Sequence, residues 1–219
     1  MGTLTVSLAG LASPFSLSVG PTRVHKEIKS YQEIKQSNVV MQREDYSCGA
    51  ASLATIMTYF FNDDTSEQEL LDIADELVDR DEQDLEKRGL SLLDLKHIAE
   101  HRGYRAGGFR LKVDDIKKLK GPVIIYFKPG GYEHFAVLKG VKGNRVFIAD
   151  PSRGNYRQRL DLFVEEWDGV TLALDGRPAM ENDTSPLVLH DDKMVQPERL
   201  SIERMMQAGM LTAPRKFSP

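Results

Sequence analysis

The sequence predicts an α+β domain in which N-terminal helices pack on an antiparallel β-sheet. Apolar residues recur at helical spacing in three segments of the first half of the chain. The second half contains β-rich apolar runs, and two of these runs flank a short turn that contains glycine and asparagine. Helices followed by hairpin-connected strands are typical of the α+β class.

Three helices are expected from apolar periodicity and capping residues. The first begins at Cys48, and the small residues of its first turns indicate close packing against a neighbour. The second begins at Thr65 or Ser66, each of which has Gln or Glu three residues later in a capping-box pattern. The third covers residues 91–102 and ends before Gly103.

Five strands are expected in the second half of the chain. They cover residues 122–127, 134–141, 145–149, 157–163 and 170–174. Residues 142–144 predict a hairpin turn. With a three-residue loop at 141–143, His134 falls directly opposite Asp150, and other turn lengths shift this register by one or two residues.

The 219 residues fit one domain with added tails. We predict a flexible lead-in at residues 1–22, a folded domain at residues 23–175 and a C-terminal appendage at residues 176–219. The appendage has one candidate helix near residues 198–210.

Composition excludes several classes of function. The formal net charge of -4 comes without a basic stripe, which argues against nucleic-acid binding. No apolar run of about 18 residues predicts a transmembrane helix. One cysteine permits neither an intrachain disulfide nor a cysteine zinc site. His97 and His101 have metal-compatible spacing but no evident third ligand, so we expect a polar helix face, no metal and no cofactor.

Three residues could form a nucleophilic site. Cys48 lies where a loop becomes a helix, and the positive end of the helix dipole favours a thiolate there. His134 opens one strand and Asp150 closes its neighbour, so the hairpin can bring an imidazole and a carboxylate into hydrogen-bond contact. Considered alone, Cys48 could equally be an inert, packed thiol. Considered without Cys48, His134 and Asp150 could be an ordinary ion pair on the surface.

Gln42 lies six residues before Cys48. A side-chain amide near a nucleophile can donate a hydrogen bond to a developing oxyanion, together with a backbone N–H group. A glutamine considered alone is uninformative, because most glutamines are solvated.

Three segments in order resemble the sequence boxes of the C39 peptidase family, the bacteriocin-processing or double-glycine cysteine peptidases. Residues 42–54 resemble the cysteine box, residues 134–141 the histidine box and residues 146–154 the aspartate box. The resemblance covers roughly residues 39–174 and includes both the Gln-to-Cys and the His-to-Asp spacings.

The resemblance implies a papain-like cysteine peptidase fold and a role for each matched residue. Cys48 would be the nucleophile, His134 the general base and acid, Asp150 the group that orients the histidine, and Gln42 the oxyanion donor. The substrate would be a leader or secretion-substrate peptide, cleaved after a Gly-Gly pair.

The chain departs from the best-known family members because no ABC transporter follows the peptidase segment. It resembles a stand-alone branch, part of which accompanies the secretion of functional amyloid (the Fap system) in Gram-negative bacteria. A secretion or transport system is therefore the expected partner. The resemblance suggests the periplasm. Met1 to Ser18 lacks the basic region of a complete signal peptide, so the sequence leaves a cytoplasmic location open.

Three alternatives stay open at the level of sequence. A thiol acyltransferase could use the same three residues with an amine acceptor in place of water. A peptide-binding, chaperone-like homologue could support secretion with little turnover. Finally, Cys48 could be a structural residue that merely packs.

Overall fold

The computed structural model describes residues 15–19, 22–26, 29–77, 89–180 and 184–189. Its helices are α1 (Tyr31–Gln36), α2 (Cys48–Phe60), α3 (Glu67–Leu77), α5 (Leu92–His101), α6 (Val113–Ile116) and α7 (Leu160–Glu166), with a 3-10 turn, η1, at Pro129–Gly131. Its strands are β1 (Phe15–Val19), β2 (Thr22–Lys26), β3 (Arg105–Arg110), β4 (Val123–Phe127), β5 (His134–Lys142), β6 (Arg145–Asp150), β7 (Gly154–Arg159) and β8 (Val170–Asp175).

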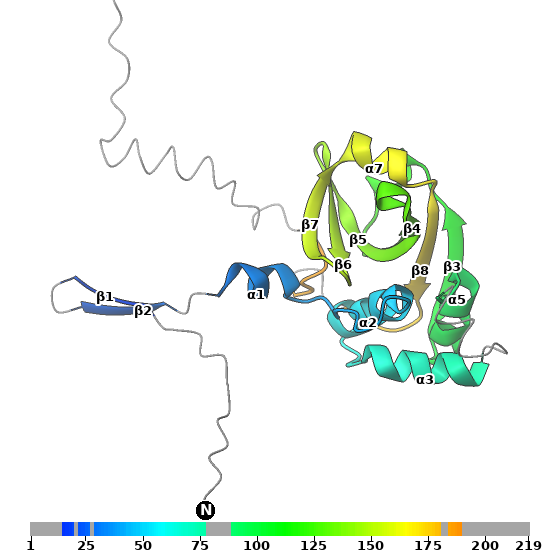
Figure 1. Ribbon diagram of the computed structural model, residues 1–219, viewed down its shortest axis with the longest axis horizontal. Helices are drawn as coiled ribbons and strands as arrows, with labels where there is room; N and C mark the ends of the chain where they lie inside the picture. Colours follow the sequence, from blue (N-terminus) through cyan, green and yellow to red (C-terminus); the bar gives the residue numbers. More distant parts are fainter. Residues whose placement is uncertain (1–14, 20–21, 27–28, 78–88, 181–183, 190–219) are drawn as a thin grey trace, which may run out of the picture.

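Six of the strands form one antiparallel sheet in the order β3-β8-β4-β5-β6-β7. The sheet curves strongly, and α2, α3 and α5 gather at one side of it while α7 lies at the other (Figure 1). β1 and β2 form a separate two-stranded antiparallel sheet. The predicted α+β class is confirmed.

The three predicted helix starts are confirmed, and two of them have capping boxes. Ser66 and Glu69 exchange hydrogen bonds before α3, where the Ser66 N–H donates to the Glu69 carboxyl group over 2.7 Å. Ser91 and Asp94 form the equivalent capping box before α5. Each box satisfies backbone N–H groups that have no partner within the helix.

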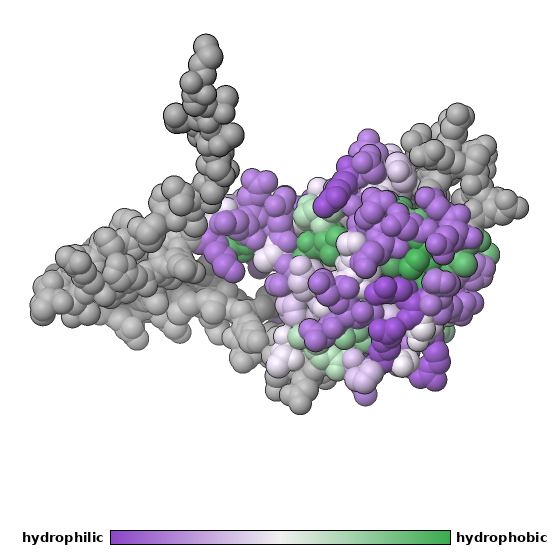
Figure 2. Space-filling model, turned by 90° about the horizontal axis from the view of Figure 1, so that it is seen from below, coloured by the Kyte–Doolittle hydropathy of each residue, from purple (hydrophilic) through white to green (hydrophobic). Residues whose placement is uncertain are grey.

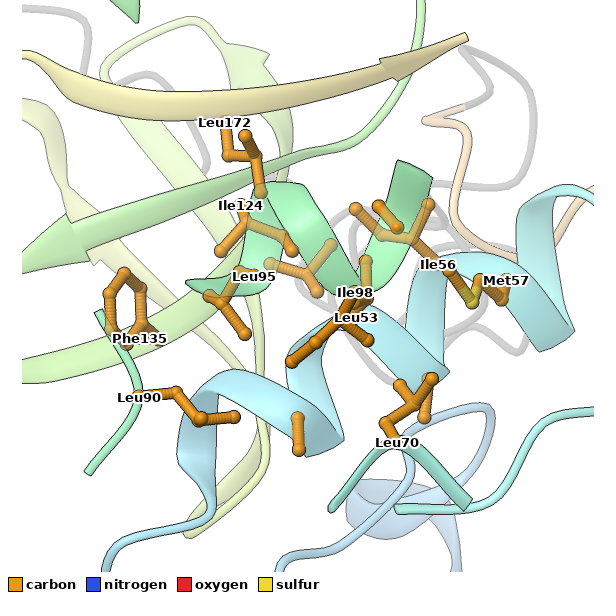
Figure 3. Packing of buried hydrophobic residues seen from close by; sticks show 14 of the residues in the cluster. Leu53, Ile56, Met57, Leu70, Leu90, Leu95, Ile98, Ile124, Phe135 and Leu172 are labelled. Carbon is orange, nitrogen blue, oxygen red and sulfur yellow. The ribbon is translucent and has the colours of Figure 1, made fainter. Parts of the chain in front are cut away.

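The largest buried cluster lies between the three helices and one face of the sheet. Leu53 of α2, Leu95 of α5 and Ile124 of β4 are fully buried in it. Figure 3 shows the side chains of α2 and α5 packed against each other beneath the strands that carry Ile124 and Leu172. This packing fixes the position of the N-terminus of α2 relative to the sheet.

A second cluster covers the opposite face of the sheet. Phe163 of α7 is fully buried there, stacks on Trp167 with ring centroids 5.3 Å apart, and lies beside Phe127 of β4. The central strands β4 and β5 are therefore buried on both faces. This explains why the sequences of both strands are continuous apolar runs and do not alternate between apolar and polar residues.

Two parts of the sheet differ from the prediction. The strand expected at residues 157–163 ends at Arg159, and the chain continues as α7. Tertiary packing decides this, because a helix buries Phe163 while leaving its acidic neighbours in solvent. The edge strand β3 was not predicted, since its two central glycines interrupt any apolar pattern.

The described residues that follow Asp175 pack on the domain. The Met180 N–H donates to the carbonyl of Phe60, and Leu187 is fully buried in the helical cluster. The predicted helix near residues 198–210 lies outside the described residues. The domain boundaries stay predictions.

The surface is mixed in character. On the face shown in Figure 2, hydrophilic side chains surround smaller hydrophobic patches. Within the described ranges, no helix combines the length and the hydrophobicity that crossing a membrane requires.

Candidate active site

Cys48 is the first residue of α2, directly after the N-cap Ser47. Its side chain is half-buried. The next residue is Gly49, and a Cβ atom there would lie 3.1 Å from Leu95 and 3.4 Å from the ring of Phe135 on β5. The glycine therefore lets α2 approach β5 closely, which places the thiol beside the start of that strand.

His134 starts β5 and Asp150 ends β6, as predicted, but the two are not directly opposed. The hairpin has a two-residue turn, with Lys142 paired to Arg145. Gly143 occupies the first turn position with φ = 57°, a conformation that glycine adopts without steric cost. The hairpin turn is confirmed, but its length is not the three residues that would place His134 opposite Asp150; it is one of the other turn lengths that the sequence left open.

A β-bulge corrects the face on which Asp150 lies. Continued regularly from the turn, the ladder would place Asp150 opposite Val137, on the face away from His134. Lys139 is an extra residue between Leu138 and Gly140, so the pairing shifts by one and Val137 faces Ala149. Asp150 then falls opposite Ala136 and shares the face of His134 as a diagonal neighbour, within reach of a histidine side chain.

The two side chains meet in a buried hydrogen bond. His134 Nε2 lies 2.9 Å from Asp150 Oδ1, and the residues are 5% and 0% exposed. Because Nε2 is engaged, Nδ1 is the ring nitrogen left for the hydrogen bond with Cys48. The structure thus brings the predicted cysteine, histidine and aspartate together.

Burial and hydrogen bonding act in opposite directions on the charged forms. Burial lowers the pKa of His134, but hydrogen bonds with Asp150 and Cys48 and their charges outweigh it and raise the pKa to about 9. Burial raises the pKa of Asp150, but hydrogen bonds from His134, Ser152 and Arg153 hold it well below its usual range. An imidazolium–carboxylate pair is therefore stable at neutral pH.

The loop that precedes Cys48 is fixed at both ends. The Gln42 N–H donates to the carbonyl of Pro151 over 3.0 Å, which ties the loop to the turn after Asp150. The carboxyl group of Glu67, buried on α3, accepts from the Arg43 N–H over 3.1 Å and contacts the Ser47 hydroxyl. Sequence reasoning missed Glu67, since nothing along the chain links α3 to this loop.

The side chain of Gln42 makes no described hydrogen bond with Cys48, His134 or Asp150. Its Nε2 donates to the carbonyl of Glu44 over 2.9 Å, and its Oε1 is buried without a partner among the described residues. Gln42 does not line the cleft that contains Cys48. The amide retains a second N–H group, and its role as oxyanion donor stays a prediction.

Cys48 and His134 both line a cleft of about 830 Å³. Its lining combines apolar side chains, among them Leu90, Leu92 and Phe135, with polar residues such as Ser91 and Glu133. Burial and a hydrogen bond to Glu133 raise the pKa of Tyr126, another wall residue, to about 12. A concave site of this volume, with apolar walls and a few polar groups, is typical of a ligand-binding cleft.

Comparison with known proteins identifies the family. The sequence model of the peptidase C39 family matches residues 36–179. This chain belongs to the peptidase C39 family. It is a cysteine peptidase, and the family assigned from its three sequence boxes is confirmed.

Named relatives and a solved structure support the same family and fold. The chain is 34% identical to the probable functional amyloid protease FapD of Pseudomonas aeruginosa over 80% of this chain and 75% of that protein. It is 35% identical to the FapD of Pseudomonas fluorescens over 72% and 69% of the two chains. The peptidase domain of Streptococcus ComA, a bi-functional ABC transporter, shares the fold with a TM-score of 0.54, at 22% identity over 64% of this chain and 98% of that chain. The papain-like fold is confirmed.

Proposed function

We propose that this peptidase cleaves a leader or secretion-substrate peptide after a Gly-Gly pair, with Cys48 as nucleophile. One observation carries the proposal: Cys48 and His134 line the same cleft of about 830 Å³, and the histidine is hydrogen-bonded to a buried carboxylate. This is the arrangement that nucleophilic acyl transfer requires, with nucleophile, base and orienting group in series.

The proposed reaction proceeds through a thioester. In the resting site His134 already holds the thiol proton as an imidazolium, and the Cys48 thiolate attacks the carbonyl carbon of the scissile bond. The Cys48 N–H and the Gln42 amide donate to the oxyanion. The imidazolium then protonates the leaving amine as the C–N bond breaks. Water, deprotonated by His134, attacks the thioester and releases the carboxylic acid and the thiol.

The similarity to FapD supports a substrate class and a partner. Two relatives are named as probable functional amyloid proteases, so we propose a polypeptide of a functional-amyloid secretion system as the substrate. The proposed compartment is the periplasm, where such a polypeptide would be accessible. Fractionation of cells that express the native gene tests the location.

The mechanism is tested by alkylation of Cys48 with iodoacetamide across pH. In the wild type we expect rapid reaction at about pH 6, where a free cysteine of pKa about 8.5 is almost wholly protonated. His134→Ala should abolish this reactivity, and His97→Ala, on the exposed face of α5, is the matched control. Equal rates in the wild type and in His134→Ala would sink the peptidase mechanism.

Cleavage specificity is tested with synthetic leader peptides that carry Gly-Gly or Ala-Ala at the same position. Mass spectrometry should locate a single cut after Gly-Gly and none after Ala-Ala. Transfer to an added amine in preference to water would instead indicate an acyltransferase. A Cys48→Ala strain that still secretes its substrate normally would indicate a binding role.

A further inference from the structure

Asp150 has two cationic partners, one on each carboxylate oxygen. Oδ1 receives His134 Nε2, the backbone N–H groups of Ser152 and Arg153, and the Ser152 hydroxyl, at 2.8 to 3.2 Å. Oδ2 receives Arg153 Nε at 2.7 Å. The arginine is therefore an ion-pair partner of the same carboxylate that holds His134.

Arg153 is held in this position although its side chain is 45% exposed. Its Nη2 donates to the hydroxyl of Tyr156 over 2.7 Å, and its Cζ lies 4.5 Å from the centre of the Tyr156 ring. Tyr156 belongs to β7 and is half-buried. A guanidinium fixed both by a carboxylate and by an aromatic ring is more than a mobile surface charge.

We propose that Arg153 is a positioning residue that limits how strongly Asp150 stabilises protonated His134. The inference rests on the proposed function, because it assigns His134 the role of acid and base. Arg153 carries a permanent charge. By sharing the carboxylate, it weakens the hold of Asp150 on the imidazolium and makes His134 a better acid toward the leaving amine.

The other groups around the pair do not supply this charge. Cys48 faces His134 from α2, and the Phe127 ring faces it from β4 with centroids 5.8 Å apart. Glu133, the preceding residue, is paired with Lys128. The charges of Asp150 and Glu166 reach the Tyr156 phenol. Among the described contacts, Arg153 is the cation besides His134 that pairs with Asp150.

The direct test is an NMR titration of the His134 imidazole in the full chain carrying Cys48→Ala, which leaves Asp150 and Arg153 as the partners under test. Arg153→Gln should raise the pKa of His134 by about half to one pH unit, for the loss of a half-exposed charge that pairs with the same carboxylate. Arg153→Lys retains the charge and should return most of the difference. Arg110→Gln, which breaks an exposed ion pair with Asp168, is the matched control and should change nothing.

A kinetic measurement distinguishes an electrostatic role of Arg153 from a purely structural one. With Cys48 present, Arg153→Gln should move the alkaline limit of kcat/KM upward, whereas a purely structural role would lower activity at every pH alike. An unchanged or lower His134 pKa in Arg153→Gln would overturn the proposal. The titration needs no substrate, so it can fail while the alkylation of Cys48 still supports the peptidase mechanism, and the converse also holds.

Discussion

Replacement of Asp150 by asparagine tests the proposed site most directly. The asparagine has nearly the same shape, but its NH₂ group cannot accept hydrogen bonds from His134 or Arg153. His134 would stay buried while losing its carboxylate partner. We therefore expect the imidazolium to lose most of its stabilisation and the Cys48 thiolate to lose its counter-ion.

The magnitude follows from the pKa of His134. The rise from the ordinary value of 6.5 to about 9 corresponds to ~3 kcal/mol in favour of the imidazolium, and Asp150 supplies the larger part of it. Its removal should lower the pKa of His134 to the ordinary value or below, because burial then acts unopposed. A loss of about 10²–10³-fold in kcat/KM at neutral pH follows from ~3 kcal/mol.

The assay is the pH dependence of Cys48 alkylation, followed by peptide cleavage. In Asp150→Asn, the rapid reaction at about pH 6 should disappear and reactivity should rise only with the ionisation of an ordinary thiol. Asp175→Asn, which breaks an exposed ion pair with Arg105, serves as the matched control. A wild-type alkylation profile in Asp150→Asn would refute the role of the carboxylate.

Three further outcomes are expected. Glu67→Ala should lower the free energy of unfolding by about 1–3 kcal/mol and slow cleavage, since it leaves the Arg43 N–H without its acceptor while the Ser47 hydroxyl keeps the Glu44 carbonyl; urea titration measures this. Gly154→Ala should lower Tm, because φ is +77° and a Cβ would lie 2.5 Å from a backbone carbonyl oxygen. In Cys48→Ala, the hydrogen bond with Asp150 should still hold the folded-state pKa of His134 above the unfolded value. Its stabilisation should therefore be complete below about pH 6.5 and decrease as pH rises toward 9, by at most ~3 kcal/mol, with no such slope when His134→Asn is added.

Local sequence signals predicted much of the fold. Capping boxes and apolar stripes placed α3 and α5, because helix caps and helical periodicity depend on residues within a few positions of one another. The strands β4 and β5 could also be predicted from their apolar runs, because strands buried on both faces need apolar side chains throughout. The family boxes likewise picked out the cysteine, histidine and aspartate that the structure brings together.

Tertiary structure decided what depends on contacts between distant segments. The bulge at Lys139 sets the face of Asp150. Gly140 is a weak sign of a bulge, but which residue stays unpaired is decided only when β5 pairs with β6. The segment after Arg159 became a helix because Phe163 packs against β4 from the far side of the sheet. The pairing of Arg153 with Asp150 depends on a turn whose geometry is fixed only when β6 and β7 pair. The sequence therefore determined which residues could react, and long-range packing determined their alignment and the charges that surround them.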